Sequence, residues 1–344
     1  MNVYKLLKLS RLRRVPGWIK LLGLWGLYVG RRRCIGIFLD PVLACNLRCR
    51  MCLFSTEEHR RRMKGMLDEA TLDRLEASLF PYALKLQIGC GAEPTLYPRL
   101  RDIVERGRRA GIPYISLVTN GQLVGSGKVD LMELAEAGLA ELTLSMHGTR
   151  AETYEYLMPG ARFELLQALL SVVKRVKGRF PDFKVRVNFT VNSMNIGDLE
   201  GSGFWDVWPA GVQPDIVQLR PVQNLGDSSW TDFDLTPLKE RYDQTFGAII
   251  GECRRRGITC IAPDRDQIDA VATPQSGTEA AIEDFTYCYV APESTYKHDF
   301  DLSADTFRTY HRRHHTGWRL LRTALGGASG RDKNISKKLN YTIK

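Results

Sequence analysis

The chain is organised around the stretch Leu39-Asp40-Pro41-Val42-Leu43-Ala44-Cys45-Asn46-Leu47-Arg48-Cys49-Arg50-Met51-Cys52, which carries three cysteines at C-x3-C-x2-C spacing. The cysteines follow an apolar run, residues 35–39, that we expect to form a strand. Three thiolates this close together can hold three corners of a cubane iron–sulfur cluster, because such clusters are bound through Cys thiolates. A complete set has four ligands, so the fourth iron would stay open to bind a small molecule directly.

Two other interpretations of the cysteines stay open on spacing alone. One is a structural zinc site, which normally has four Cys or His ligands in a closed tetrahedron. His59 is the candidate fourth ligand, although it lies in the charged run 57–62. The other interpretation is three buried cysteines with no ligand role.

Composition places the chain among ordinary globular proteins. Its 344 residues are 44% hydrophobic and 26% charged, which is enough chain for one large domain or two. Eight cysteines are too sparse for a disulfide scaffold, so we expect a cytoplasmic protein in a reducing compartment. The net charge of +10 permits contact with nucleic acid, anionic lipid or a phosphorylated substrate, although for any one basic cluster we favour a solvated face with no dedicated partner.

Residues 1–33 are predicted to form a basic amphipathic helical extension, broken at Pro16-Gly17. The apolar run from Trp18 to Val29 is shorter than the roughly 20 residues that span a bilayer. It can lie in a membrane interface, as a peripheral contact, or pack with its apolar face on the rest of the protein. We favour packing, and a membrane-associated protein remains the alternative.

Strand-like and helix-like runs alternate from Cys34 onward. The expected strands are residues 35–39, 84–88, 114–118, 139–145, 184–191 and 216–219, with helices between them. Six such units predict an α/β fold with a parallel sheet and right-handed crossovers. Chemistry in such folds lies at the carboxyl ends of the strands.

Polar motifs follow these strands where that rule places a site. Gly89-Cys90-Gly91-Ala92-Glu93-Pro94 comes after the second strand, and Val118-Thr119-Asn120-Gly121 after the third. The fourth strand ends in Ser145-Met146-His147. Asn188 lies among apolar residues of the fifth strand, and Arg220 ends the sixth, where a guanidinium can bind a carboxylate or phosphate.

The cysteine loop and the G-A-E-P turn together resemble the radical S-adenosylmethionine (SAM) enzymes. The resemblance implies a partial (β/α)6 barrel over residues 34–225 and a [4Fe–4S] cluster held by Cys45, Cys49 and Cys52. In that family an external one-electron donor of the flavodoxin or ferredoxin type reduces the cluster, which cleaves SAM reductively. The resulting 5′-deoxyadenosyl radical takes a hydrogen atom from the substrate.

The resemblance also suggests which residues bind SAM. The cofactor-binding candidates are Met51, Gly91, Glu93, Asn120, Ser145, Asn188 and Arg220. Gly91 and Glu93 correspond to the G-G-E-P motif that meets the amino group of SAM, although Ala92 replaces its second glycine. Met51 occupies the usually aromatic position near the adenine, and Arg220 could hold either SAM or the substrate.

The remaining region, residues 226–344, resembles a SPASM or Twitch domain in degenerate form, and we expect a small α+β appendage with a basic tail. Cysteines 253, 260 and 288 lie in it, and no cysteine follows Cys288. Three interpretations remain open. The region is a relic without a cluster, it holds a second, auxiliary iron–sulfur cluster, or Cys288 is a catalytic hydrogen-atom donor.

The substrate is not specified by these motifs. We favour modification of a sugar or sugar-lipid, by epimerisation, dehydrogenation or dehydration. The alternative is a maturase of a ribosomally made peptide, for which residues 1–33 look too short to supply a peptide-binding domain. The non-enzyme alternative is a zinc-containing, basic nucleic-acid-binding protein, which leaves the strand-end motifs unexplained. We therefore expect a small-molecule or peptide substrate and no nucleic acid.

Overall fold

The structure is a computed structural model that describes residues 15–224, 228–269, 277–326 and 342–343. Its described strands form a single sheet in the order β10-β7-β6-β5-β4-β3-β2-β1-β8-β9. The six expected strands are present and each is parallel to its neighbour: β1 (Ile35–Leu39), β2 (Ala83–Ile88), β3 (Ile115–Thr119), β4 (Glu141–Ser145), β5 (Lys184–Val191) and β6 (Ile216–Pro221).

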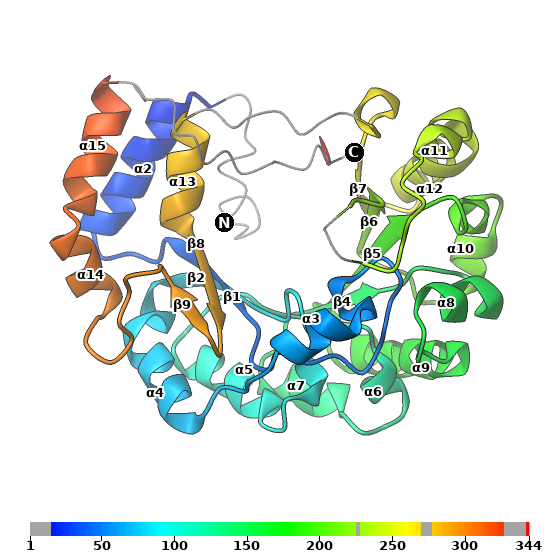
Figure 1. The fold of residues 1–344 in the computed structure, drawn as a ribbon, viewed down its shortest axis with the longest axis horizontal. Helices are drawn as coiled ribbons and strands as arrows, with labels where there is room; N and C mark the ends of the chain where they lie inside the picture. Colours follow the sequence, from blue (N-terminus) through cyan, green and yellow to red (C-terminus); the bar gives the residue numbers. More distant parts are fainter. Residues whose placement is uncertain (1–14, 225–227, 270–276, 327–341, 344) are drawn as a thin grey trace.

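Helices follow these strands and cover the outer, convex side of the curved sheet (Figure 1). They are α4 (Glu69–Ser78), α5 (Leu100–Arg109), α6 (Gln122–Gly125), α7 (Leu131–Ala137), α8 (Ala151–Leu157), α9 (Phe163–Arg179) and α10 (Gly203–Asp206). Local sequence sets their ends: Asp68 caps α4 by accepting from Thr71 N, and α7 stops at Gly138, whose φ is +120°. The predicted partial α/β barrel is confirmed.

The C-terminal region extends the same sheet at both edges. β7 (Thr259–Ala262) is parallel to β6, and β8 (Tyr287–Ala291) is parallel to β1. The antiparallel strands β9 (Ser294–Tyr296) and β10 (Thr342–Ile343) then close off the two edges. Eight consecutive parallel strands therefore form an open barrel, and the predicted α+β appendage is built onto its edges. The domain boundary near residue 225 stays a prediction.

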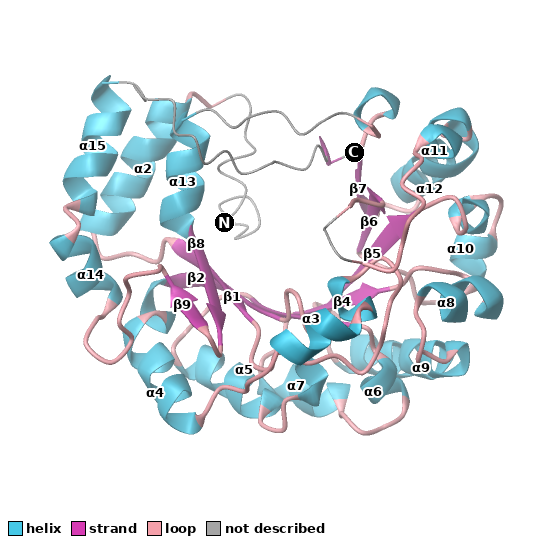
Figure 2. Ribbon diagram, in the orientation of Figure 1, coloured by secondary structure: helices cyan, strands magenta, loops and turns pink. Residues whose placement is uncertain are grey.

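The helices of the two terminal regions pack together beside β8 and β9 (Figure 2). They are α2 (Gly17–Val29), α13 (Gly277–Thr286), α14 (Phe307–Arg313) and α15 (Thr316–Gly326), whereas α11 (Thr236–Glu240) and α12 (Ala248–Arg255) lie by β7. Leu21 and Leu24 of α2 are buried, and the Tyr28 ring meets Phe285 edge-on. One apolar face of the N-terminal helix thus packs on the protein, as favoured from the sequence; residues 1–14 lie outside the described residues.

Strand β5 shows how the sheet separates its two faces. Its alternate residues Val185, Val187, Phe189 and Val191 are fully buried under the helices. Arg186 and Asn188 point to the inner face, where Arg186 Nε donates to Glu141 Oε1 over 3.0 Å. This buried ion pair fills the amino-terminal end of the barrel with protein groups.

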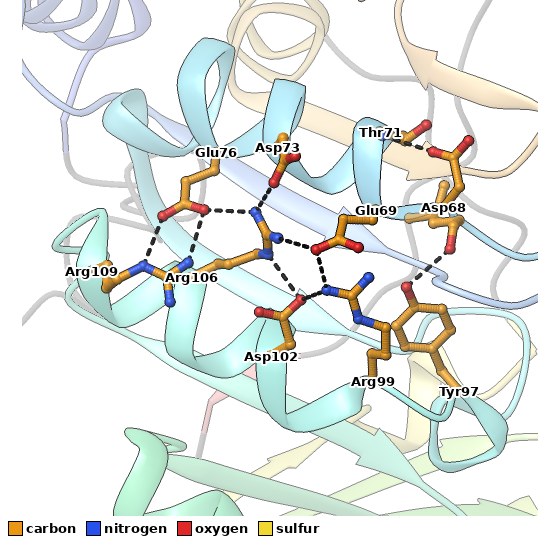
Figure 3. Close-up of polar contacts among 11 residues, drawn as sticks. Asp68, Glu69, Thr71, Asp73, Glu76, Tyr97, Arg99, Asp102, Arg106 and Arg109 are labelled. Carbon is orange, nitrogen blue, oxygen red and sulfur yellow. Dashed lines mark hydrogen bonds and ion pairs between the residues drawn. The ribbon is translucent and has the colours of Figure 1, made fainter.

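A charged cluster joins α4 to α5 on the outside of the barrel (Figure 3). The side chain of Arg106 is 8% exposed and pairs with Asp73 at 2.5 Å, Glu76 at 2.9 Å and Asp102 at 2.9 Å. A guanidinium with this many carboxylate partners compensates for its burial, which an isolated charge could not. The cluster holds in place the helices that follow the cysteine loop and the G-A-E-P turn.

Candidate active site

Three loops meet at the carboxyl ends of β1, β2 and β3. Glu93 N, in the G-A-E-P turn after β2, donates to Ala44 O beside the first cysteine over 2.9 Å. Asn120, in the T-N-G turn after β3, donates from Nδ2 to Oδ1 of Asn46 inside the cysteine loop over 2.8 Å. The strand-end rule predicted that these motifs lie close together, and direct hydrogen bonds join them in the structure.

Glu93 is the acceptor at the centre of this arrangement and is only 3% exposed. Its Oε1 accepts from Thr95 N at 3.1 Å, Thr95 Oγ1 at 2.5 Å and Thr119 Oγ1 at 2.7 Å. Its Oε2 accepts from Asn120 N at 2.8 Å. Burial raises the pKa of Glu93, and the donor from Asn120 offsets part of that rise. Because each carboxylate oxygen has about two acceptor sites, Oε2 keeps capacity for one further donor such as an ammonium group.

Asp40 is a residue of this site that the sequence analysis did not single out. It is 1% exposed, and its carboxylate accepts from the backbone N–H of Cys90 at 2.7 Å and of Gly91 at 3.0 Å. The hydroxyl of Tyr289 on β8 donates to it over 2.9 Å. Asp40 thus shapes the turn that carries Glu93. The available signal was an acidic residue directly after β1, facing the edge where the polar motifs gather.

The three cysteines of the loop are partly exposed thiols. Burial raises the pKa of Cys45 to about 12 and raises that of Cys49, to which the neighbouring Cys45 and Cys52 also contribute. Backbone N–H groups lie against the sulfurs: Leu47 N donates to Cys45 Sγ over 3.4 Å. A thiolate that is only partly hydrated needs compensating positive charge, which iron would supply, and N–H donors to sulfur are typical of cluster sites.

The zinc interpretation needs a fourth ligand beside the three thiols. Among the described residues, no three Cys, His, Asp or Glu side chains converge as the ligands of a single ion would. A cubane cluster distributes its thiolates over different irons, so its ligands stand further apart than those of one tetrahedral ion. His59 packs edge-on against Phe54, at 5.4 Å between ring centroids. Three thiols with backbone N–H donors nearby, and His59 packed on Phe54, are the donors expected for a cluster that keeps one iron open.

The glycines of the turn after β2 have different roles. Gly89 has a φ of +89°, and a Cβ there would lie 2.5 Å from Val118 O, so the fold itself requires glycine. A Cβ on Gly91 would meet only Asp40 Oδ2, at an ordinary 3.6 Å. Gly91 is therefore open on the side where we expect SAM, consistent with a close approach of ligand to backbone.

Met51 lies apart from Gly91 and Glu93, near the ends of β5 and β6. It is 7% exposed and packs with Val222 and Trp230. Its sulfur accepts from Nδ2 of Asn192 over 2.9 Å. The last turn of the cysteine loop, which follows β1, is thereby attached to the segments after β5 and β6. The role of Met51 near an adenine stays a prediction.

Ser145, Asn188 and Arg220 lie on the inner face of β4, β5 and β6. Ser145 is in register with Asn188, and Asn188 with Gln218. With its amide oxygen turned towards Arg220, Gln218 accepts from the guanidinium at 3.0 Å. Asn188 Oδ1 is buried with no hydrogen-bond partner among the described residues. These three predicted residues line the lumen, as their alternation on the strands indicated.

Cys288 is not brought to this site. It is fully buried on β8 and in register with Ile37, whereas the inner-face neighbours at this level are Phe38 and Tyr289. Its thiol therefore lies between sheet and helices and does not face the lumen, and burial raises its pKa. The prediction that Cys288 donates a hydrogen atom to substrate is not supported by this geometry.

The other two C-terminal cysteines do not complete a second cluster site with Cys288. Cys253 on α12 and Cys260 on β7 are buried beside each other at one edge of the sheet, while β8 lies near the opposite edge. An auxiliary cluster needs its thiolates in one place. The described residues show no such group.

The fold is an open parallel barrel, and its three-cysteine loop is joined through the buried Glu93 to the next two strand ends. This combination is typical of barrel enzymes that use an iron–sulfur cluster. The model of the Radical SAM superfamily matches residues 40–200. Residues 40–200 are thus identified as a radical SAM domain, and this family implies a [4Fe–4S] cluster and SAM as cofactors. Family membership indicates an enzyme that needs an electron donor, and leaves its reaction class open.

Individual relatives are distant. The chain is 28% identical over 160 residues to the tungsten-containing aldehyde ferredoxin oxidoreductase cofactor-modifying protein of Pyrococcus furiosus, covering 45% of this chain and 43% of that protein. It is 28% identical over 153 residues to a probable GTP 3′,8-cyclase of Saccharolobus solfataricus, covering 44% and 46%. The chain thus spans less than half the length of these relatives, through the shared core.

Solved structures support the fold. Streptococcus suis SuiB matches with a TM-score of 0.52 at 15% identity, covering 80% of this chain and 62% of SuiB. The structure of SuiB bound to precursor peptide SuiA matches with the same TM-score. At this identity the likeness concerns the arrangement of helices and strands.

Proposed function

We propose that this protein binds SAM at the carboxyl ends of β1–β3 and uses it to abstract a hydrogen atom from a substrate held in the barrel lumen. The observation that carries the proposal is the hydrogen-bonded junction of the cysteine loop, Glu93 and Asn120. When bound, the cluster and SAM supply the electron and the radical chemistry, and the protein supplies binding and orientation.

Each residue of the junction has a separate task in this proposal. Cys45, Cys49 and Cys52 hold the cluster, and Glu93 accepts the SAM ammonium at its second oxygen, Oε2. Asp40 orients the backbone of the turn at Gly91, through the N–H bonds described above. Partial burial of the whole junction keeps water away from a reactive centre.

The proposal is tested by iron and acid-labile sulfide per chain after anaerobic reconstitution. The expected result is about four irons in the wild type and none in the triple variant Cys45→Ala/Cys49→Ala/Cys52→Ala. Each single Cys→Ala variant is expected to lose 5′-deoxyadenosine formation with a chemical reductant. Cleavage of SAM that survives in any of the three would refute the ligand assignment. Cys288→Ala, also a buried cysteine, is the matched control and should keep the cluster.

For the substrate we propose a small polar molecule of the sugar or sugar-lipid type. The inner face of β5 and β6 supports this choice, because the amide and cationic groups of Asn188, Gln218 and Arg220 line the lumen there. They lie towards the carboxyl-terminal end of the barrel, which we call its mouth. A peptide substrate is the second candidate, since the SuiB fold has been seen with a precursor peptide. Incubation with deuterated candidates separates the two: transfer of deuterium into 5′-deoxyadenosine identifies the substrate that is activated.

We also propose a peripheral contact with anionic membranes through α2 and α15. Trp18 and Ile19 of α2 are 53% and 42% exposed, and Trp318 and Leu325 of α15 are 67% and 73% exposed. The two helices pack against each other and run in opposite directions, because Gly317 lies against Tyr28. In the sequence, the basic segments 1–14 and 327–341 precede α2 and follow α15. No helix among the described residues is long and apolar enough to cross a bilayer.

The membrane proposal is tested by co-sedimentation with vesicles containing phosphatidylserine and with neutral vesicles. We expect binding to the anionic vesicles only, and a loss of binding in Trp18→Ser/Trp318→Ser. Met194→Ser is the control, because Met194 is 49% exposed on the segment after β5. Equal sedimentation of wild type and double variant would refute the contact.

A further inference from the structure

A histidine side chain continues the hydrogen-bond ladder between β4 and β5 beyond its last backbone pair. Thr190 N donates to Nδ1 of His147 over 3.1 Å. Nδ1 is therefore an acceptor, and the proton of the neutral ring lies on Nε2. Burial, together with the charge of Arg220, lowers the pKa of His147 to about 4, so the ring is neutral at pH 7.

The Nε2–H group of the His147 ring can donate a hydrogen bond to a ligand. His147 keeps part of its surface exposed, and within the described part of the chain Nε2 has no hydrogen-bond partner. Nδ1 is held by β5, and Asn195 Nδ2 donates to the carbonyl of His147 over 2.9 Å. The ring is thus held through Nδ1 and the backbone of the same residue through its carbonyl, which leaves the Nε2–H group on the other side of the ring.

Arg220 reaches the same part of the mouth from the next strand. It is in register with Thr190, so the two residues share the inner face of the sheet. With its amide oxygen turned towards Arg220, Gln218 accepts from both Nε and Nη2 of the guanidinium at 3.0 Å. Besides burial, the charge of Arg220 lowers the pKa of His147 and also that of Arg186, so Arg220 lies within electrostatic range of both side chains. A fixed guanidinium beside a fixed N–H donor is suited to an anion.

We propose that His147 and Arg220 bind an anionic group of the substrate, a carboxylate or a phosphate, at the carboxyl ends of β4–β6. His147 donates from Nε2, and Arg220 pairs with the anion through its guanidinium. This inference rests on the proposed function and specifies it, because it assigns an acidic or phosphorylated molecule to the lumen.

The position of Arg220 favours the substrate over SAM, an alternative that the sequence left open. Glu93 follows β2 and Arg220 ends β6, four strands further along the sheet. At about 4.8 Å between neighbouring strands, this separation is roughly 19 Å measured along the curved sheet, which places the two residues on different sides of the lumen. The amino and carboxylate groups of SAM share one carbon atom. A SAM molecule whose ammonium lies at Glu93 therefore has its carboxylate away from Arg220.

The test is isothermal titration calorimetry of the anaerobic, cluster-loaded protein with SAM present and no reductant. Inorganic pyrophosphate and citrate are the two probes, one for phosphates and one for carboxylates. Arg220→Gln and His147→Phe are expected to weaken binding of the preferred probe by about 10- to 100-fold, the effect of losing a hydrogen bond to a charged group. Arg220→Lys and His147→Gln, which keep a donor, should recover most of it.

Arg254→Gln is the matched control, since it removes one positive charge from the exposed part of α12. Tighter binding of pyrophosphate assigns a phosphorylated substrate, and tighter binding of citrate assigns a carboxylic acid. The proposal is overturned if the wild type binds neither probe, or if Arg220→Gln binds as tightly as Arg254→Gln. SAM affinity is titrated separately, so a failure of the wild type to bind SAM counts against the proposed function instead.

Discussion

Replacing Asp40 by asparagine tests the physical basis of the site without touching a proposed ligand. The carboxylate accepts two short backbone bonds, from Cys90 N and Gly91 N, and one from the Tyr289 hydroxyl. Asparagine keeps one acceptor oxygen and places an NH₂ group where the other oxygen was. At least one buried N–H then faces a donor, and the remaining bonds lose the help of a charge.

The expected cost follows from those bonds. An unsatisfied buried donor costs about 1–3 kcal/mol, and a bond to a charged group contributes roughly 1 kcal/mol more than a neutral one. We therefore expect Asp40→Asn to lower the free energy of opening of the 89–95 turn by about 2–4 kcal/mol. Its amides should exchange hydrogen about 30- to 1,000-fold faster than in the wild type. SAM affinity should fall as well, because Gly91 and Glu93 are no longer held in position.

Hydrogen–deuterium exchange measured by mass spectrometry on the peptide covering 89–95 is the assay. Asp68→Asn is the control, because Asp68 caps α4 from an exposed position where asparagine serves equally well. Tyr289→Phe removes a single hydroxyl and should have an intermediate effect. If Asp40→Asn leaves exchange of this turn within about threefold of the wild type, equivalent to roughly 0.65 kcal/mol, the reasoning is refuted.

Three further predictions concern single residues. Glu93→Gln puts an NH₂ group against Asn120 N and the expected SAM ammonium. SAM affinity, measured by equilibrium dialysis, should therefore fall about 10- to 100-fold while the iron content stays unchanged. Unchanged affinity would exclude Glu93 from the SAM site. Burial lowers the pKa of His311 to about 3, so the folded protein keeps this ring neutral while the unfolded chain binds a proton below about pH 6.5. Stability should therefore fall by up to about 2 kcal/mol between pH 6.5 and 5, and His311→Gln should flatten that slope in denaturation curves; an unaltered slope would contradict the assignment. Arg106→Met leaves a group of carboxylates facing one another and should lower the free energy of unfolding in urea by about 1–3 kcal/mol. Arg109→Met, at a 55% exposed side chain, should lower it by less than about 0.5 kcal/mol. Equal losses would show that the α4–α5 cluster does not stabilise this contact.

Local sequence was sufficient for the elements and for the position of the site. Alternating apolar runs with glycine stops predicted six parallel strands, because burial of one face has a fixed period in a strand and in a helix. The spacing of Cys45, Cys49 and Cys52 indicated the cluster, since ligand chemistry depends on residues close together in the chain. The strand-end rule then placed Glu93 and Asn120 beside them.

Tertiary structure decided what depends on partners far apart in the chain. Asp40 acquires its role only through Cys90 and Tyr289, which lie 50 and 249 positions away. Cys288 looked reactive in the sequence, yet the register of β8 with β1 turns its thiol towards the helices, because adjacent residues of a strand face opposite sides. The sequence of the C-terminal region likewise predicted a separate appendage. Its strands instead pair with both edges of the barrel, since unpaired backbone groups at a sheet edge are stabilised by whichever strand can reach them.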